Sequence, residues 1–182
     1  MKKAIGMVEF KTVSSGMRAA DRMVKTAEVE LLQADTVCPG KFLAIISGDL
    51  SAVKAAVEAA AIGDAEQLID TFVLGNPHDS IFSALYGASE IGSPNALGVL
   101  ETFSASAAIV AADVAAKTAL VDLIELRLAR GMCGKSYLLL TGEIAAVEAA
   151  IERAKQGAGE NGMFLDSAVI PRPDEKFWSK IL

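Results

Sequence analysis

Two cysteines and one histidine are the side chains of this sequence best suited to bind a metal or to serve as nucleophile or base. They are Cys38, Cys133 and His78. The cysteines lack C-x-x-C spacing and are too few for a disulfide framework, so we expect free thiols. His78 follows Asn76-Pro77 in a turn, and catalysis needs a base held beside a nucleophile. We therefore predict no enzyme and assign His78 no role.

The two cysteines lie in glycine-containing loops of different character. Cys38 is followed by Pro39 and Gly40, in a loop where core packing places few constraints on the cysteine side chain. Cys133 is preceded by Met132, and a free cysteine is commonly a small buried hydrophobe, which is the interpretation we favour for it. Gly40 and Gly134, which lie shortly after the two cysteines, suit either a tight turn or a close approach of backbones.

An internal repeat places these two loops at equivalent positions. AIGMVEF from Ala4 matches ALGVLETF from Ala96, an offset of 92 residues (96 minus 4). GKFLAIISGDLSAVKAAVEAA from Gly40 matches GKSYLLLTGEIAAVEAAIERA from Gly134, an offset of 94 (134 minus 40). The second copy therefore has two extra residues just before Gly134. A repeat of this length predicts two copies of one structural unit.

We place the two domains at residues 1–90 and 91–182, with the boundary near residues 87–95. Within the first unit, hydrophobic periodicity predicts two helices and four strands. The expected strands are Ala4–Phe10, one containing Val29 and Leu31, Phe42–Ile46, and Leu68–Leu74. The first helix, capped by Ser14 or Ser15, has Met17, Ala20, Val24 and Ala27 on its apolar face. The second, capped by Asp49, has Val53, Ala56, Val57 and Ala60.

The order βαββαβ predicts a ferredoxin-like α/β (α+β) unit with a four-stranded antiparallel sheet and both helices on one face. RNA-recognition motifs share this order but need paired aromatic residues and a basic surface. The net charge of −6 argues against nucleic acid as a partner. The apolar stretch Ala105–Val121 contains Asp113 and Lys117, so we expect no membrane span. Glu9 and Lys11 interrupt the N-terminal apolar run, so we expect no signal peptide and a cytosolic location.

The strings AIGMVE, AADRMVKTAEVELL, GKFLAIISGDLSAVKAAVEAA and IPRP together resemble the bacterial microcompartment shell domain, in unpermuted order in both halves. TVCPGKF at Thr36–Phe42 is similar to the pore loop of tandem shell proteins from propanediol-utilisation compartments that hold an iron-sulfur cluster. The resemblance covers nearly every residue. It implies a structural protein of the compartment shell within the cytoplasm, built as a homotrimer with pseudo-six-fold symmetry.

The resemblance also implies roles for particular residues. Shell tiles of this family pack edge to edge with other shell proteins, and an encapsulated redox enzyme is a further implied partner. Edge positions correspond to Lys25, Lys117 and Arg172, although each lysine also suits an ordinary i,i+4 pair with the aspartate four residues before it. The implied pore lining comprises Cys38, Pro39, Gly40, Lys41, Gly131, Met132, Cys133 and Gly134.

The implied cofactor is one 4Fe-4S cluster per trimer, ligated by three Cys38 thiolates. Such a cluster needs about four ligands, which one chain cannot supply. Three-fold symmetry brings three copies of Cys38 together and leaves one iron without a cysteine. An empty thiol-lined pore, or zinc held by three thiolates and a water, satisfies the same geometry. A soluble iron-sulfur carrier or a small-molecule-binding sensor is the alternative function.

Overall fold

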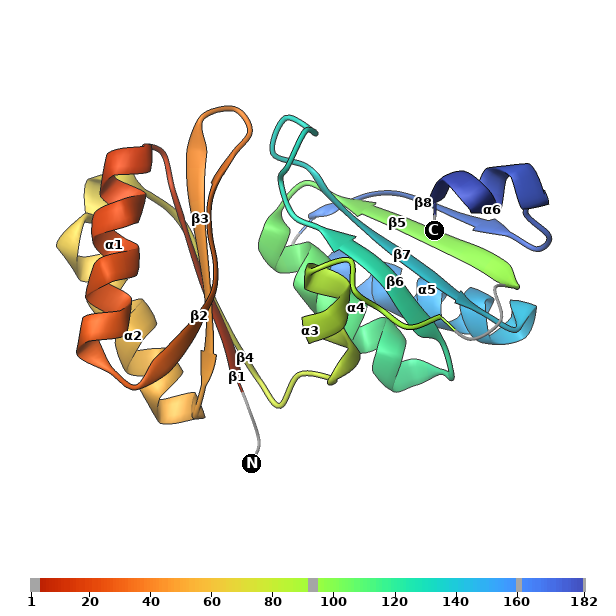
Figure 1. Cartoon of the computed structure of the whole chain (residues 1–182), viewed down its shortest axis with the longest axis horizontal. Helices are drawn as coiled ribbons and strands as arrows, with labels where there is room; N and C mark the ends of the chain where they lie inside the picture. Colours follow the sequence, from red (N-terminus) through yellow and green to blue (C-terminus); the bar gives the residue numbers. More distant parts are fainter. Residues whose placement is uncertain (1–3, 92–94, 160–161, 182) are drawn as a thin grey trace. The chain divides into compact units, whose positions relative to one another are not determined.

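The computed structural model describes residues 4–91, 95–159 and 162–181, and the chain divides into two compact units, Met1–Pro77 and His78–Leu182 (Figure 1). The expected boundary near residues 87–95 lies partly in residues 92–94, outside the described residues. Helix α3 (Ser80–Leu85) packs against strand β6 (Asp122–Arg127) of the second unit.

Each unit has the βαββαβ order that the sequence predicts. The first contains β1 (Ala4–Phe10), α1 (Val13–Thr26), β2 (Val29–Val37), β3 (Lys41–Gly48), α2 (Leu50–Gly63), a short 3-10 helix (Ala65–Gln67) and β4 (Leu68–Gly75). After α3, the second contains β5 (Ala96–Thr102), α4 (Ala105–Thr118), β6, β7 (Ser136–Gly142), α5 (Ile144–Gly159), β8 (Phe164–Ile170) and a C-terminal helix, α6 (Glu175–Ile181).

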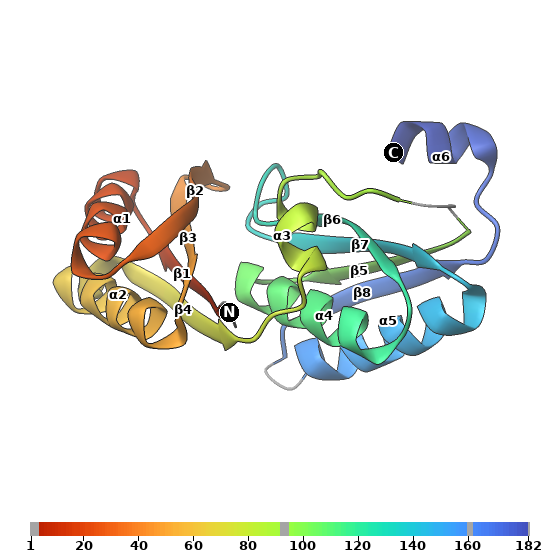
Figure 2. The same ribbon diagram turned by 60° about the horizontal axis from the view of Figure 1, so that its bottom comes forward.

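The sheets have the orders β2-β3-β1-β4 and β6-β7-β5-β8, and every pair of neighbours is antiparallel. In each unit the two long helices cover one face of the sheet (Figures 1 and 2). The central strand β1 is buried along its whole length, which explains why it is apolar apart from Glu9. The predicted tandem ferredoxin-like fold is confirmed.

Strand registers reproduce both repeat offsets. Phe10 pairs with Phe42 in the first sheet, and Thr102 pairs with Ser136 in the second. The β-bulge between Leu31 and Gln33 recurs at the equivalent place in β6. The two extra residues therefore lie between β6 and β7, in the counterpart of the Cys38 loop.

The second helix behaves as the sequence predicts. Asp49 is at the N-cap of α2, although its side chain makes no capping hydrogen bond. All four residues of the predicted apolar face are buried against the sheet: Val53, Ala56, Val57 and Ala60.

The prediction for the first helix is partly wrong. Met17 and Val24 are exposed, and α1 begins after Thr12 rather than at the serines. The reason is a close contact with the sheet: a Cβ on Gly16 would lie 2.4 Å from atoms of Phe42. Helix α1 therefore packs mainly through small residues together with Met23, while Met17 and Val24 face outward.

Candidate functional site

The Cys38 loop is the tight turn between β2 and β3 (Figure 1). Val37 and Lys41 pair across the base of the hairpin, and the Gly40 N–H donates to the Val37 carbonyl at 2.9 Å. Gly40 has φ of +101° with no atom near the position of a Cβ, so backbone conformation is the reason for a glycine there. The Cys38–Pro39 peptide is cis. Cys38 is partly exposed, so its thiol remains accessible at the end of the hairpin.

Lys41, the residue that ends this loop, has its side chain bound within its own unit. Its Nζ forms an ion pair with Oε1 of Glu9, on the central strand β1. The side chains of Lys41 and Glu9 are only 21% and 4% exposed. The Lys41 ammonium group is therefore held against the sheet.

The second loop, between β6 and β7, has a different backbone. Its left-handed residues are Ala129, Gly131, Cys133 and Gly134. The Lys135 N–H donates to the Met132 carbonyl at 3.1 Å, which closes a turn around Cys133. Cys133 is exposed. The expectation that it is a buried hydrophobe is therefore wrong, because the longer loop carries it away from the packed strands.

His78 makes local contacts through both its backbone and its ring. Its backbone N–H donates to Oδ1 of Asp113 at 2.8 Å, and its Nδ1 lies 2.8 Å from the Ser80 hydroxyl. Within residues 4–91, 95–159 and 162–181, no three His, Cys, Asp or Glu side chains gather as a metal site in one chain.

The expected edge residues lie at the surface. Lys25 Nζ binds Oδ2 of Asp21 at 2.6 Å, and Lys117 Nζ binds Oδ2 of Asp113 at 2.7 Å. The aspartates differ, because the Asp21 side chain is 58% exposed and that of Asp113 is 9% exposed. Arg172 is exposed just after β8. The structure thus contains both i,i+4 pairs, and the pair in the second unit has a buried carboxylate.

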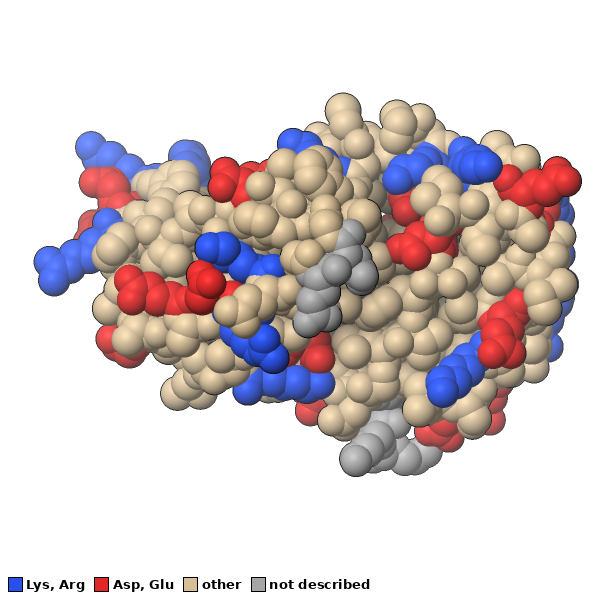
Figure 3. Space-filling model, turned by 180° about the vertical axis from the view of Figure 1, so that it is seen from behind, with Lys and Arg blue, Asp and Glu red and all other residues tan. Residues whose placement is uncertain are grey.

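Charges of opposite sign lie side by side over the surface. On the face shown in Figure 3, Lys and Arg side chains are interspersed with Asp and Glu. Among the described residues, no helix is long and apolar enough to cross a membrane.

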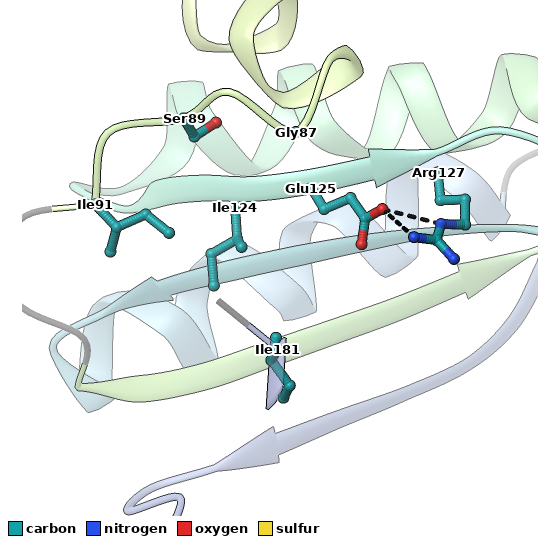
Figure 4. Close-up of a pocket in the computed structure, with 7 residues that line it drawn as sticks. All are labelled: Gly87, Ser89, Ile91, Ile124, Glu125, Arg127 and Ile181. Atoms are coloured by element: carbon teal, nitrogen blue, oxygen red, sulfur yellow. Dashed lines mark hydrogen bonds and ion pairs between the residues drawn. The ribbon is translucent and has the colours of Figure 1, made fainter. Parts of the chain in front are cut away.

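A small cavity in the second unit was not foreseen from the sequence (Figure 4). Its volume is about 230 Å³, and its lining residues are Gly87, Ser89, Ile91, Ile124, Glu125, Arg127 and Ile181. The Arg127 Nε and Nη2 donate to Oε1 of Glu125 at 2.9 and 2.7 Å, and the Tyr137 hydroxyl donates to Oε2 at 2.7 Å. The acid and the base in its wall therefore already satisfy one another.

This cluster perturbs the ionisation of its members. Burial, followed by the hydrogen bond to Glu125, raises the pKa of Tyr137 to about 12. The same carboxylate raises the pKa of Arg127. The equivalent residues of the first repeat are Gln33, Asp35 and Leu43. That departure from the repeat was the one sequence signal that distinguished these positions.

Comparisons with known proteins agree with the duplicated architecture. The BMC domain family matches residues 4–77 and 96–173. Bacterial microcompartment shell protein PduT of Citrobacter freundii is 38% identical over 182 residues, which cover 100% of this chain and 99% of that protein. Shell protein PduA of the same organism is 37% identical over 82 residues, covering 44% of this chain and 88% of PduA. One PduA-length domain thus corresponds to about half of the chain.

A solved structure shows the same fold over nearly the full length. The crystal structure of a microcompartment protein from Desulfitobacterium hafniense DCB superposes with a TM-score of 0.94 at 42% identity. The match covers 98% of this chain and 99% of that one.

Proposed function

This chain belongs to the BMC-domain family, as a tandem-domain microcompartment shell protein of the PduT type, and from that premise we propose that it forms a trimeric tile whose pore holds an iron-sulfur cluster. The observation that carries the proposal is the position of Cys38 at the end of a three-residue hairpin loop. The tile is a structural part of the shell, and its cluster carries single electrons across the shell or is delivered to a partner.

The trimer follows from the duplication. Each chain has two ferredoxin-like units, so three chains provide a ring of six units with cyclic symmetry. The loops between the second and third strands of each unit then line the central opening, Cys38, Pro39, Gly40 and Lys41 from one unit and Gly131, Met132, Cys133 and Gly134 from the other. Lys25, Lys117 and Arg172 lie at the outer edge, where neighbouring shell proteins dock.

The donor chemistry fits the cluster only in the trimer. Iron-sulfur clusters take thiolate ligands, usually four, and Cys38 supplies one partly exposed thiol per chain. Three copies around the axis match the three-fold axis of a cubane and leave one iron for a different ligand. When bound, the cluster supplies one-electron transfer. Each chain contributes one Cys38 thiolate, and the three loops together close the opening to metabolites.

Electron transfer across the shell requires a redox partner on at least one side. An encapsulated redox enzyme is the partner that this chemistry implies. A soluble iron-sulfur carrier is the competing function, and it differs in a measurable way. A carrier remains a dispersed trimer that gives up its cluster, whereas a shell tile assembles into sheets or joins cages with related proteins.

The test is anaerobic purification followed by iron and sulfide analysis of the wild type, Cys38→Ser and Cys133→Ser. We expect brown wild-type protein with about four irons per trimer, loss of iron and colour in Cys38→Ser, and no loss in Cys133→Ser. Cys133 is the matched control because its loop is the repeat counterpart of the Cys38 loop. A wild type that binds only zinc, or stays colourless after anaerobic reconstitution, would refute the cluster and leave the shell role.

A further inference from the structure

The ion pair between Lys41 and Glu9 lies at the base of the Cys38 loop. We infer that Glu9 and Lys41 position the Cys38 loop and balance the charge beside it, so that they set the reduction potential of the cluster. This inference rests on the function proposed above.

The Cys38 loop is short and is held at both ends. Only Cys38, Pro39 and Gly40 separate Val37 from Lys41, which are paired across the hairpin. The Lys41 backbone begins β3, and its side chain is tied to β1 through Glu9. The loop is therefore held by the central strand as well as by its own hairpin. Three thiolates must meet at one cluster, so a loop ordered in advance lowers the entropic cost of binding.

The second repeat supplies an internal comparison. Its equivalent residues are Glu101 and Lys135, the same two residue types. Among the residues that the structure describes, no ion pair joins them. Lys135 lies before β7, which begins at Ser136, whereas Lys41 is the first residue of β3. The pair thus forms only beside the loop that contains Cys38.

The charges of Glu9 and Lys41 lie largely buried beside the loop. Glu9 and Lys41 are shielded from solvent, so salt screens their charges weakly. Asp70 on β4 is the register neighbour of Glu9, and Asp35 on β2 lies two residues before Val37, the register neighbour of Lys41. While the pair is intact, its charges largely cancel at the cluster. Removing Lys41 leaves a carboxylate, which favours the oxidised cluster, and removing Glu9 leaves an ammonium group, which favours the reduced one.

The test compares Lys41→Met, Glu9→Gln, the double variant and Lys41→Arg, with Lys135→Met as the control in the second repeat. Reduction potentials are measured by spectroscopically monitored redox titration at a single pH. Trimer mass and iron content are measured for each protein. We expect a lower potential for Lys41→Met and a higher one for Glu9→Gln.

We also expect Lys41→Arg and Lys135→Met to stay close to the wild type. The double variant should keep a near-wild-type potential, because both charges are removed, but should bind less iron, because the tie to β1 is lost. Shifts of the same sign in both single variants, or an equal shift in Lys135→Met, would overturn the inference while leaving the cluster in place. Wild-type protein without iron would instead overturn the proposed function, and the inference with it. If a single variant fails to trimerise, the double variant and Lys41→Arg still decide the matter, since a shifted potential in both would contradict charge balance.

Discussion

Gly63 and Gly157 occupy equivalent positions near the ends of α2 and α5, yet they leave room for different neighbours. A Cβ on Gly63 would lie 1.5 Å from Nη1 of Arg22, whereas a Cβ on Gly157 would lie 3.4 Å from Cγ2 of Val114. Arg22 and Val114 are themselves equivalent in the repeat. The same helix contact is therefore polar in the first unit and apolar in the second.

The polar version is an ion-pair cluster on Asp64. Arg18 and Arg22 both bind its carboxylate, and the hydrogen bond from Arg18 is the main cause of its lowered pKa. Replacing Gly157 with Ala should stabilise the protein by about 0.5–1 kcal/mol, because alanine loses less backbone entropy in a helix and meets only ordinary contacts. Gly63→Ala should stabilise less or destabilise, because it displaces Arg22 from Asp64.

Urea unfolding midpoints of the two variants at one protein concentration check this prediction. Equal stabilisation by both alanines would show that the Arg22 contact does not constrain Gly63.

Tyr137 should make stability depend on pH in the alkaline range. Its pKa is raised from 10.0 to about 12 in the folded protein, first by burial and then by the bond to Glu125. A raised pKa means that the folded state retains the proton longer than the unfolded state. The contribution of Tyr137 is therefore fully present below pH 10 and is lost as pH rises towards about 12.

Phenolate absorbance titrations of Tyr86→Phe and Tyr137→Phe separate the two tyrosines. In Tyr86→Phe, absorbance should report ionisation of Tyr137 well above pH 10, and Tyr137→Phe should show a shallower loss of stability in this pH range. Ionisation of Tyr137 at about pH 10 would contradict the prediction.

The sequence predicted correctly those elements in which the regularly spaced apolar residues are also the ones that pack in the core. The apolar face of α2 was correct because that helix packs through the residues that are both apolar and regularly spaced. In α1, Gly16 sets the contact by its small size, which an apolar pattern does not reveal. Cys133 was wrongly predicted to be buried, because two inserted residues change the backbone of its loop. The Glu125–Tyr137 contact joins separate strands, so only the fold could bring those residues together.

Lys25 and Lys117 should govern lateral assembly. Replacing both with Ala should leave the trimer intact, because each removes an i,i+4 pair worth about 0.2–0.5 kcal/mol, while sheets seen by electron microscopy should weaken. Lys117→Ala should cost more stability than Lys25→Ala, since Asp113 is buried and Asp21 is exposed. Lys54→Ala, at an exposed position on α2, is the control. Unchanged sheets in the double variant would remove the edge assignment.

Native mass spectrometry of anaerobically purified protein tests the central claim in one measurement, because subunit number and bound cluster both appear in the mass. The account predicts a species with three chains of 18.9 kDa each and the additional mass of one cluster of about four irons and four sulfides. Cys38→Ser should give the same trimer without the added mass. A monomer or dimer would contradict the tile, and a wild-type trimer with no added mass would contradict the cluster at its centre.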